Sequence, residues 1–393
     1  MNFFKFSFLQ YIGILISLLI NFFLAKNISQ ENYGIYSLGL VLFNTIIGVK
    51  DYGLERNSLV RLNLYSPSCV KVEYTSQFIV RLFILLFLFV LSSFYIEYNN
   101  YQSYLYLYSL GAIVFSITPK FFFDFNKQFV RESLIALCDR AFYLIAILCF
   151  FVFDKLEVFY ISLSYFLSRL IYFILTLKSL KSWIDFRVID YLKVKKIFNE
   201  NFLFWLTTVF NTILLSANQL VLSSKQGVLD LAIFSFALQF VSLLRILQNQ
   251  FLRWQVPGLS EKISNNNLSI SYINKKLIKS LLFSLTFSIL LYISAGIIIT
   301  NFYPNYTKSI RVLAILCIWS IFYGPGIVNS FILSNKIKPF VFFIISTFFA
   351  SVSLFANVLL NADYILTALI IVIPHTISMF VQYYLTLKNY VRN

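Results

Sequence analysis

The chain has 393 residues, of which 59% are hydrophobic, 19% aromatic and only 12% charged, and its mean hydropathy is +0.79. Soluble domains carry about 25% charged residues, so this composition excludes a water-soluble globule and indicates a membrane protein. The 32 Lys and Arg outnumber the 16 Asp and Glu, which gives a formal net charge of +16. With four dispersed cysteines, one histidine and no HExxH or CxxC spacing, the sequence predicts no metal site, disulfide framework or cofactor.

Twelve apolar runs are long enough to cross a bilayer, for which about 20 residues are needed. In chain order they cover residues 6–25, 33–49, 77–96, 102–119, 136–153, 158–177, 201–222, 231–252, 281–301, 310–333, 339–360 and 364–386. No small-residue cleavage site closes the first run, so we expect a retained helix rather than a signal peptide. The sequence therefore predicts an all-α integral membrane protein with twelve transmembrane helices.

The positive charges predict the orientation of these helices. If the N-terminus is cytoplasmic, most of the 32 Lys and Arg fall in cytoplasmic segments, which is the usual bias of membrane proteins. The loops on the other side then hold only Lys26, Lys155, Lys225, Lys308 and Arg311. We therefore expect both termini to be cytoplasmic. The net charge is explained by topology and by contact with anionic phospholipids, so it does not indicate a nucleic-acid partner.

An internal repeat divides the chain into halves. The segment 34–40, GIYSLGL, resembles the segment 232–238, AIFSFAL, half a chain later, with small and aromatic residues and a serine in register. Six spans followed by six spans of the same sense is a parallel repeat, as in several transporters. We expect an N-terminal six-helix bundle at residues 1–180 and a C-terminal one at 201–393. Between them, residues 181–200 are predicted to form a cytoplasmic amphipathic linker, with Trp183, Phe186, Ile189 and Leu192 beside Lys193, Lys195 and Lys196.

Several stretches resemble a known family. The segment 24–37, with Glu31-Asn32-Tyr33-Gly34-Ile35-Tyr36-Ser37, precedes Asp51-Tyr52-Gly53-Leu54 and Arg61; later come Phe302-Tyr303-Pro304-Asn305-Tyr306 and Asn335-Lys336. Together these resemble the Wzx-type polysaccharide biosynthesis flippases of the multidrug/oligosaccharidyl-lipid/polysaccharide exporter superfamily. The chain differs from the usual family pattern in being short and very rich in Phe, Ile, Asn and Tyr.

The resemblance implies two six-helix bundles around a central cavity lined by spans 1, 2, 7 and 8. It implies alternating-access transport of undecaprenyl-pyrophosphate-linked oligosaccharide repeat units, for O-antigen or capsule, from the cytoplasmic to the periplasmic leaflet of the bacterial inner membrane. Partners would include that lipid-linked glycan and, in the same pathway, the polysaccharide polymerase and chain-length regulator. The coupling ion, H⁺ or Na⁺, stays open.

Polar residues form stripes at helical spacing on the four spans expected at the cavity. They are Gln10, Gly13, Ser17 and Asn21 on span 1, Ser37, Asn44 and Gly48 on span 2, Thr208, Asn211 and Asn218 on span 7, and Ser235, Gln239, Ser242, Arg245 and Asn249 on span 8. Such stripes either line a polar cavity or join helices through close approach and hydrogen bonds. We predict that they line the cavity.

Arginine inside the hydrocarbon region is costly, so each such residue needs a physical reason. Arg245 lies on the polar stripe of span 8, and Arg169 lies deep in span 6 on a stripe with Tyr165 and Tyr172. Both are candidates for binding a diphosphate, because guanidinium is permanently charged and can donate two parallel hydrogen bonds to phosphate oxygens. Arg81 and Arg140 lie near span ends and are expected to extend to the membrane interface instead.

His375 in span 12 is a candidate coupling residue, although a lone intramembrane histidine can also be structural. No Asp or Glu is predicted in the middle of a span, which argues against a carboxylate ion relay and against a multidrug exporter of the same superfamily. Pro325 and Pro374 are candidate bending points. An integral-membrane polymerase or glycosyltransferase would need a sizeable outside loop, which the sequence lacks, so we expect a flippase rather than an enzyme.

Overall fold

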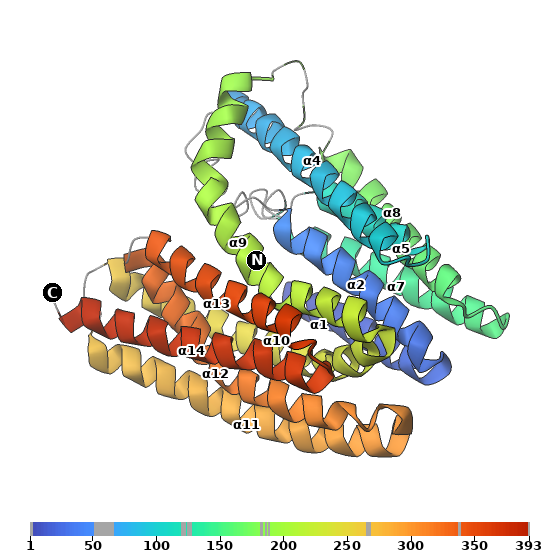
Figure 1. Ribbon diagram of the computed structural model, residues 1–393. Helices are drawn as coiled ribbons and strands as arrows, with labels where there is room; N and C mark the ends of the chain where they lie inside the picture. The colour runs from blue at the N-terminus through green and yellow to red at the C-terminus, as the bar shows by residue number, and fades with distance from the viewer. Residues whose placement is uncertain are drawn as a thin grey trace. The chain divides into compact units, whose positions relative to one another are not determined.

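The computed structural model describes residues 3–50, 67–118, 123, 128–180, 184, 187, 189–264, 269–336 and 339–391. Within this part the chain is all helical: α1 (Phe3–Asn27), α2 (Gln30–Val49), α4 (Pro67–Tyr98), α5 (Leu105–Ile117), α7 (Phe129–Val152), α8 (Val158–Leu180), α9 (Tyr191–Gln226), α10 (Val228–Ser264), α11 (Ile270–Phe302), the 3₁₀ turn η2 (Pro304–Tyr306), α12 (Ser309–Lys336), α13 (Pro339–Leu360) and α14 (Tyr364–Val391) (Figure 1). Each of the twelve predicted spans coincides with one α-helix, so the predicted fold class is confirmed.

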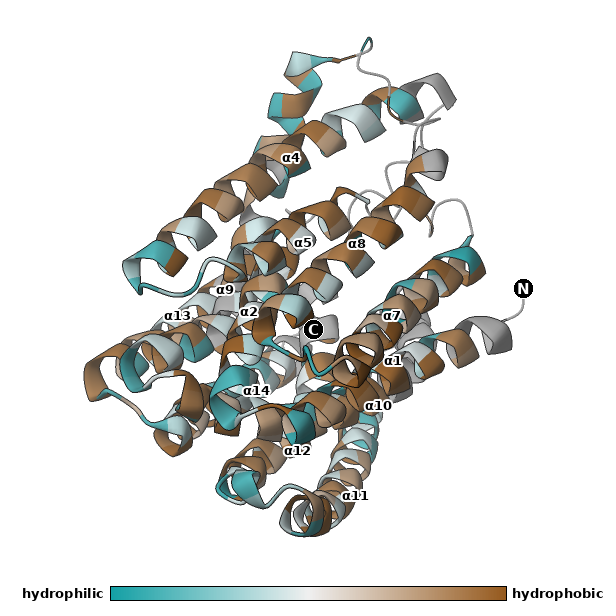
Figure 2. Cartoon of the chain, turned by 90° about the vertical axis from the view of Figure 1, so that its right-hand side faces the viewer, coloured by the Kyte–Doolittle hydropathy of each residue, from teal (hydrophilic) through white to brown (hydrophobic). Residues whose placement is uncertain are grey.

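The helices have the length and composition of membrane spans. Nine segments of the described chain are long and apolar enough to cross a bilayer, and they belong to α1, α2, α4, α7, α8, α10, α11, α12 and α14. The apolar segments Leu105–Ile117 and Thr347–Leu360 are shorter. In Figure 2 the helices are brown, hence hydrophobic, over most of their length, and teal residues gather at many helix ends. The protein is a multi-pass membrane protein.

Local sequence signals start several of these helices. Ser29 and Ser269 each accept a hydrogen bond on Oγ from the backbone N–H three residues later, at 3.2 Å, at the beginnings of α2 and α11. Asp363 accepts one from Leu366 N at 2.7 Å at the beginning of α14. Gly227, with φ of +93°, forms the one-residue connection between α9 and α10, a backbone conformation that glycine adopts without strain.

The chain forms two compact units, Met1–Thr212 and Ile213–Asn393, which we call unit 1 and unit 2. Helix α9 contributes to both. In unit 1, Trp205 donates to the carbonyl of Val49 at 2.9 Å, and in unit 2, Asn218 donates to Ser353 at 2.9 Å. Of the linker predicted at 181–200, the structure describes 184, 187 and 189–200, and Lys193 forms an ion pair with Glu73 of α4 at 3.2 Å. The linker bounds and its interfacial role stay predictions.

Several neighbouring helix pairs of unit 1 recur in unit 2. In unit 1, α5 packs against α2, α4 and α8, and α8 also packs against α7. In unit 2, α12 packs against α10, α11 and α14, and α14 also packs against α13. Helices α2, α5 and α8 therefore correspond to α10, α12 and α14, in agreement with the sequence repeat that places residues 34–40 on α2 and 232–238 on α10.

Candidate functional site

Unit 1 contains a cavity of about 540 Å³ between α1, α2, α5, α7 and α8. Its polar lining includes Gln10, Lys50, Thr118, Glu132, Ser133, Arg140 and Tyr172. These residues lie in the first halves of α1 and α7 and in the second halves or at the ends of α2, α5 and α8, so the cavity lies toward one end of the unit. By the predicted topology that end is cytoplasmic.

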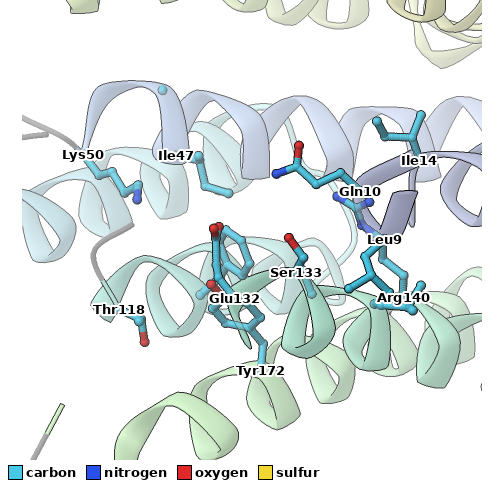
Figure 3. Close-up of a pocket in the computed structure, with 14 residues that line it drawn as sticks. Leu9, Gln10, Ile14, Ile47, Lys50, Thr118, Glu132, Ser133, Arg140 and Tyr172 are labelled. Atoms are coloured by element: carbon cyan, nitrogen blue, oxygen red, sulfur yellow. The ribbon is translucent and has the colours of Figure 1, made fainter. Parts of the chain in front are cut away.

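Two cations and one carboxylate give the cavity its charge. In Figure 3, Lys50 and Arg140 lie at opposite sides of the cavity, with Gln10, Glu132 and Ser133 between them. Arg140 packs its guanidinium directly over Gly13 of α1, where a Cβ atom would collide with it. The glycine thus makes room for the arginine between α1 and α7, and the cavity combines donors for an anion with amide and hydroxyl groups for a polyol.

Arg169 lies outside this lining but borders it through Phe115. Its guanidinium carbon lies 5.1 Å from the ring centroid of Phe43, 5.2 Å from that of Phe115 and 4.5 Å from that of Tyr165. Arg169 also forms an ion pair with Asp139 of α7, whose side chain is only 1% exposed. The buried charge is therefore compensated by a carboxylate and by aromatic faces.

Two expectations from the sequence are wrong here. Asp139 lies near the middle of α7, within the candidate span Phe129–Val152, so an acidic residue does occupy the middle of a span. The error arose because α7 begins before the apolar run does, which moves Asp139 inward. Arg81 is not an exposed residue at a helix end either: it is 2% exposed and lies well inside α4, which begins at Pro67.

In unit 2 another guanidinium, half-buried, lies against aromatic rings. Arg245 of α10 lies 4.1 Å from the ring centroid of Trp319 and 4.5 Å from that of Tyr323, both on α12. His375 of α14 contacts the same tryptophan, with its ring centroid 5.4 Å from that of Trp319 in an edge-on geometry. Among the residues that the structure describes, no carboxylate forms an ion pair with Arg245. The structure thus brings two predicted site residues, Arg245 and His375, together around one tryptophan.

The two guanidinium sites occupy corresponding places in the repeat. Arg169 lies among residues of α2, α5 and α8, and Arg245 lies among residues of α10, α12 and α14, which are the matching helices. Arg169 belongs to α8, the last of the three helices in unit 1, whereas Arg245 belongs to α10, the first of the three in unit 2. Only Arg169 has a carboxylate partner in the described chain, so the two sites differ in their net charge.

The predicted stripes on spans 1 and 2 are divided between several environments. Gln10 lines the cavity of unit 1, whereas Ser17 donates to the carbonyl of Gly13 in its own helix at 3.1 Å. Asn21 accepts a hydrogen bond from the hydroxyl of Tyr36 on α2. Asn44 is exposed. Only one of these four candidates therefore lies at the cavity of its unit.

The predicted stripes on spans 7 and 8 are similarly divided. Asn218 is fully buried and bonded to Ser353 and Asn357 of α13, at 2.9 Å in each case. Ser242 donates to Leu238 of its own helix at 2.8 Å, Gln239 is half-buried and Asn249 is exposed. The side chains of Thr208 and Asn211 lie outside the described residues. Substrate contact by any of these residues stays a prediction.

The sequence did not single out Lys50, Glu132 and Arg140 as site residues, although they supply the charges of the cavity. Each lies near the end of a predicted span, where charge is normally explained by topology. A signal was present in the spacing of Glu132, Asp139 and Arg140 on one helix, which is unusually polar for the start of a membrane span.

No protein-family model matches the chain, and no curated protein matches it in sequence. Solved structures do share its fold. The lipid II flippase MurJ matches with a TM-score of 0.76 and 17% identity over 98% of this chain and 89% of that one. A multidrug resistance MATE family transporter of the MOP superfamily matches with a TM-score of 0.70 and 12% identity, over 97% and 95%. A point mutant of the Vibrio cholerae MATE transporter VcmN matches with a TM-score of 0.55 and 12% identity over 99% of this chain and 96% of that one. The chain therefore has the all-α, two-unit fold of transporters of the MOP superfamily.

Proposed function

We propose that this protein is a flippase that moves undecaprenyl-pyrophosphate-linked oligosaccharide repeat units, for O-antigen or capsule, from the cytoplasmic to the periplasmic leaflet by alternating access. It acts without covalent chemistry in the bacterial inner membrane, with both termini in the cytoplasm. The neighbours in fold support a membrane transporter, and one of them, MurJ, is a lipid II flippase.

Arg245 is the observation that carries the proposal. Arg245 lies within the candidate span Val228–Asn249. A charged side chain in a span is costly, up to about 2.5 to 3.5 kcal/mol at the centre on insertion scales, and the described chain provides no carboxylate to offset it. The faces of Trp319 and Tyr323 hold the guanidinium in place by cation–π attraction, but these neutral rings do not neutralise its positive charge. An anionic cargo group such as a diphosphate supplies the missing counter-charge through a bidentate contact.

The cavity of unit 1 supports the same class of cargo. Arg140 and Lys50 attract phosphate, while Gln10, Ser133 and Thr118 offer hydrogen bonds of the kind that sugar hydroxyls need. An amphiphile with a charged sugar head fits such a lining because its lipid tail stays in the bilayer while the head enters the protein.

Complementation tests the role of Arg245. In a strain that lacks its own flippase, the wild-type protein restores surface polysaccharide. Arg245→Ala and Arg245→Glu, expressed at the wild-type level, are expected to restore less than about a tenth of it, because the loss of one charge-assisted contact costs about 1.5 to 3 kcal/mol. Arg311→Ala, which removes an exposed arginine at the start of α12, is the matched control and is expected to restore it fully. Full restoration by both Arg245 variants contradicts the proposed role.

Asp139 favours a second candidate function, a multidrug exporter. A buried carboxylate in a membrane span is a group on which a cationic compound or a coupling ion can bind. In this structure Arg169 already neutralises Asp139, which is why we prefer the flippase. Expression in a drug-sensitive strain separates the two: an exporter raises the inhibitory concentrations of lipophilic cations, and the flippase leaves them unchanged.

A further inference from the structure

Unit 2 has a groove of about 300 Å³ between α11, α12 and α14. These three helices are neighbours in the fold, with α12 in contact with both others (Figure 1). Ile278 and Phe380 line the groove and are 55% and 58% exposed, so the groove opens on the outer face of these helices. In a membrane protein such a face is covered by lipid.

One end of the groove is polar. Each helix contributes one polar residue there: Asn274 from α11, Asn329 from α12 and Tyr383 from α14. The Tyr383 hydroxyl donates to Oδ1 of Asn274 at 3.1 Å, which leaves the amide N–H groups of Asn274 for another acceptor. Asn329 is 3% exposed, and its Oδ1 has no donor within the described residues. A buried carbonyl without a donor is costly, so this end is suited to a ligand that carries both hydroxyl donors and oxygen acceptors.

The other end of the groove is apolar. Its lining includes Leu281 of α11, Phe322 and Pro325 of α12, and Met379 and Phe380 of α14. On all three helices the polar residue lies toward the end that is predicted to be cytoplasmic, and the apolar residues lie deeper in the span. The groove therefore changes from polar to apolar along the membrane normal, as a phospholipid does.

Lysines of α11 follow lining residues of the groove in the sequence but are not among the lining residues. Lys275 and Lys279 follow directly after the lining residues Asn274 and Ile278, one helical turn apart, and both are exposed. Lys276 lies on the same turn, with its Nζ 5.5 Å from the ring centroid of Tyr272. A lysine near the membrane surface attracts anionic headgroups, and its long side chain reaches the interface.

We propose that this groove is a binding site for one anionic glycerophospholipid of the phosphatidylglycerol type. Its phosphate lies between Lys275 and Lys279 near the amide of Asn274, its glycerol hydroxyls donate to Asn329, and one acyl chain follows Leu281 and Phe322. The site belongs to unit 2 alone and does not involve the cargo proposed above. Failure of the flippase proposal would therefore not refute it, and its own failure would not refute the flippase.

Native mass spectrometry of delipidated full-length protein tests this site. With added phosphatidylglycerol or phosphatidylcholine, the wild-type protein is expected to retain one phosphatidylglycerol with about tenfold preference. Two changes are expected to weaken that binding about tenfold: Ile278→Trp, which fills the groove, and the double variant Lys275→Gln with Lys279→Gln, which removes the charges.

The controls match each change. Leu282→Trp places the same bulk on an exposed position of α11 that does not line the groove, and Lys71→Gln with Lys195→Gln removes two exposed lysines from unit 1. Both are expected to bind the lipid as the wild type does. The site is refuted if phosphatidylcholine binds equally well or if the groove variants bind like their controls. Size-exclusion profiles and thermal unfolding identify any variant that fails to fold.

Discussion

Arg169 and Arg245 are half-buried on helices α8 and α10, and their surroundings compensate the charge in different ways. Arg169 has the carboxylate of Asp139 and three aromatic faces, whereas Arg245 has two aromatic faces and no carboxylate in the described chain. A compensated pair is complete within the protein, while an uncompensated cation attracts an anion from outside. We therefore propose that Arg245 binds the cargo and that Arg169 has a structural role.

The structural role of Arg169 can be tested by removing one or both charges. Asp139→Leu is expected to lower the free energy of unfolding by about 3 to 5 kcal/mol, because it leaves Arg169 buried without its counter-charge. Asp139→Leu combined with Arg169→Met is expected to recover much of that loss, since neither charge then remains. Thermal unfolding in detergent measures both changes. If the double variant is no more stable than Asp139→Leu, the ion pair is not the source of the loss.

At the residue scale, the sequence identified the arginines inside the spans but not the residues with which they interact. Arg169 and Arg245 could be identified because charge in an apolar run is unusual. The pairing of Arg169 with Asp139 could not, because the two residues lie on different helices, 30 positions apart in the sequence. Asn218 was predicted to line a cavity, but its amide is hydrogen-bonded to Ser353 and Asn357. Helical periodicity alone does not distinguish a residue that lines a cavity from one that joins two helices.

At the scale of elements, glycines set how closely the helices approach. A Cβ atom on Gly39 of α2 would overlap the ring of Tyr108 on α5. That ring cannot move aside easily, because Tyr108 is fully buried and its ring contacts those of Tyr36 and Tyr165. The contact between α2 and α5 therefore depends on a missing side chain.

Gly39→Ala is expected to destabilise the protein by about 1 to 3 kcal/mol through overpacking, although alanine is the better helix former. Gly296→Ala is the matched control within α11, because nothing lies within 4 Å of its added Cβ. That change is expected to be neutral or to stabilise by about 0.5 to 1 kcal/mol. The midpoint of thermal unfolding should fall for Gly39→Ala and stay or rise for Gly296→Ala, and equal shifts would show that packing at Gly39 does not decide the outcome.

The predicted spans located every helix but not its ends. Helix α4 begins at Pro67 rather than near 77, α9 at Tyr191 rather than near 201, and α10 continues to Ser264. Hydropathy marks the part of a helix that lies in hydrocarbon, whereas the backbone hydrogen bonds continue into the polar interface. Ion pairs such as that of Lys193 and Glu73 form in these extensions and were therefore not predicted.

Pro325 and Pro374 lie inside the continuous helices α12 and α14, and their role as bending points stays a prediction. The glycines beside Pro325 have a visible use. A Cβ on Gly324 would meet Ser280 and Ser284 of α11, and one on Gly326 would meet Met379 of α14. The Gly-Pro-Gly segment thus allows α12 to approach both neighbours, a packing role that the sequence did not indicate.

At the scale of the whole molecule, the repeat is the feature that the sequence predicted most completely. Seven matched residues on α2 and α10 indicated two related halves, and several of the same neighbouring helix pairs recur in unit 1 and unit 2. The cavity of unit 1 was not predicted, because its charges come from the ends of several helices that only the fold brings together. The proposed cargo therefore rests on the charge of Arg245 within its span and not on the net charge of +16.

The most direct test is transport by the purified protein. In liposomes that contain an undecaprenyl-pyrophosphate-linked oligosaccharide with a fluorescent sugar head, a membrane-impermeant quencher reports how fast the head crosses the bilayer. We expect the wild-type protein to speed this crossing at least about tenfold over protein-free liposomes and Arg245→Ala to lose most of the gain. A wild-type rate equal to that of protein-free liposomes, or an unchanged rate in Arg245→Ala, would contradict the proposed function.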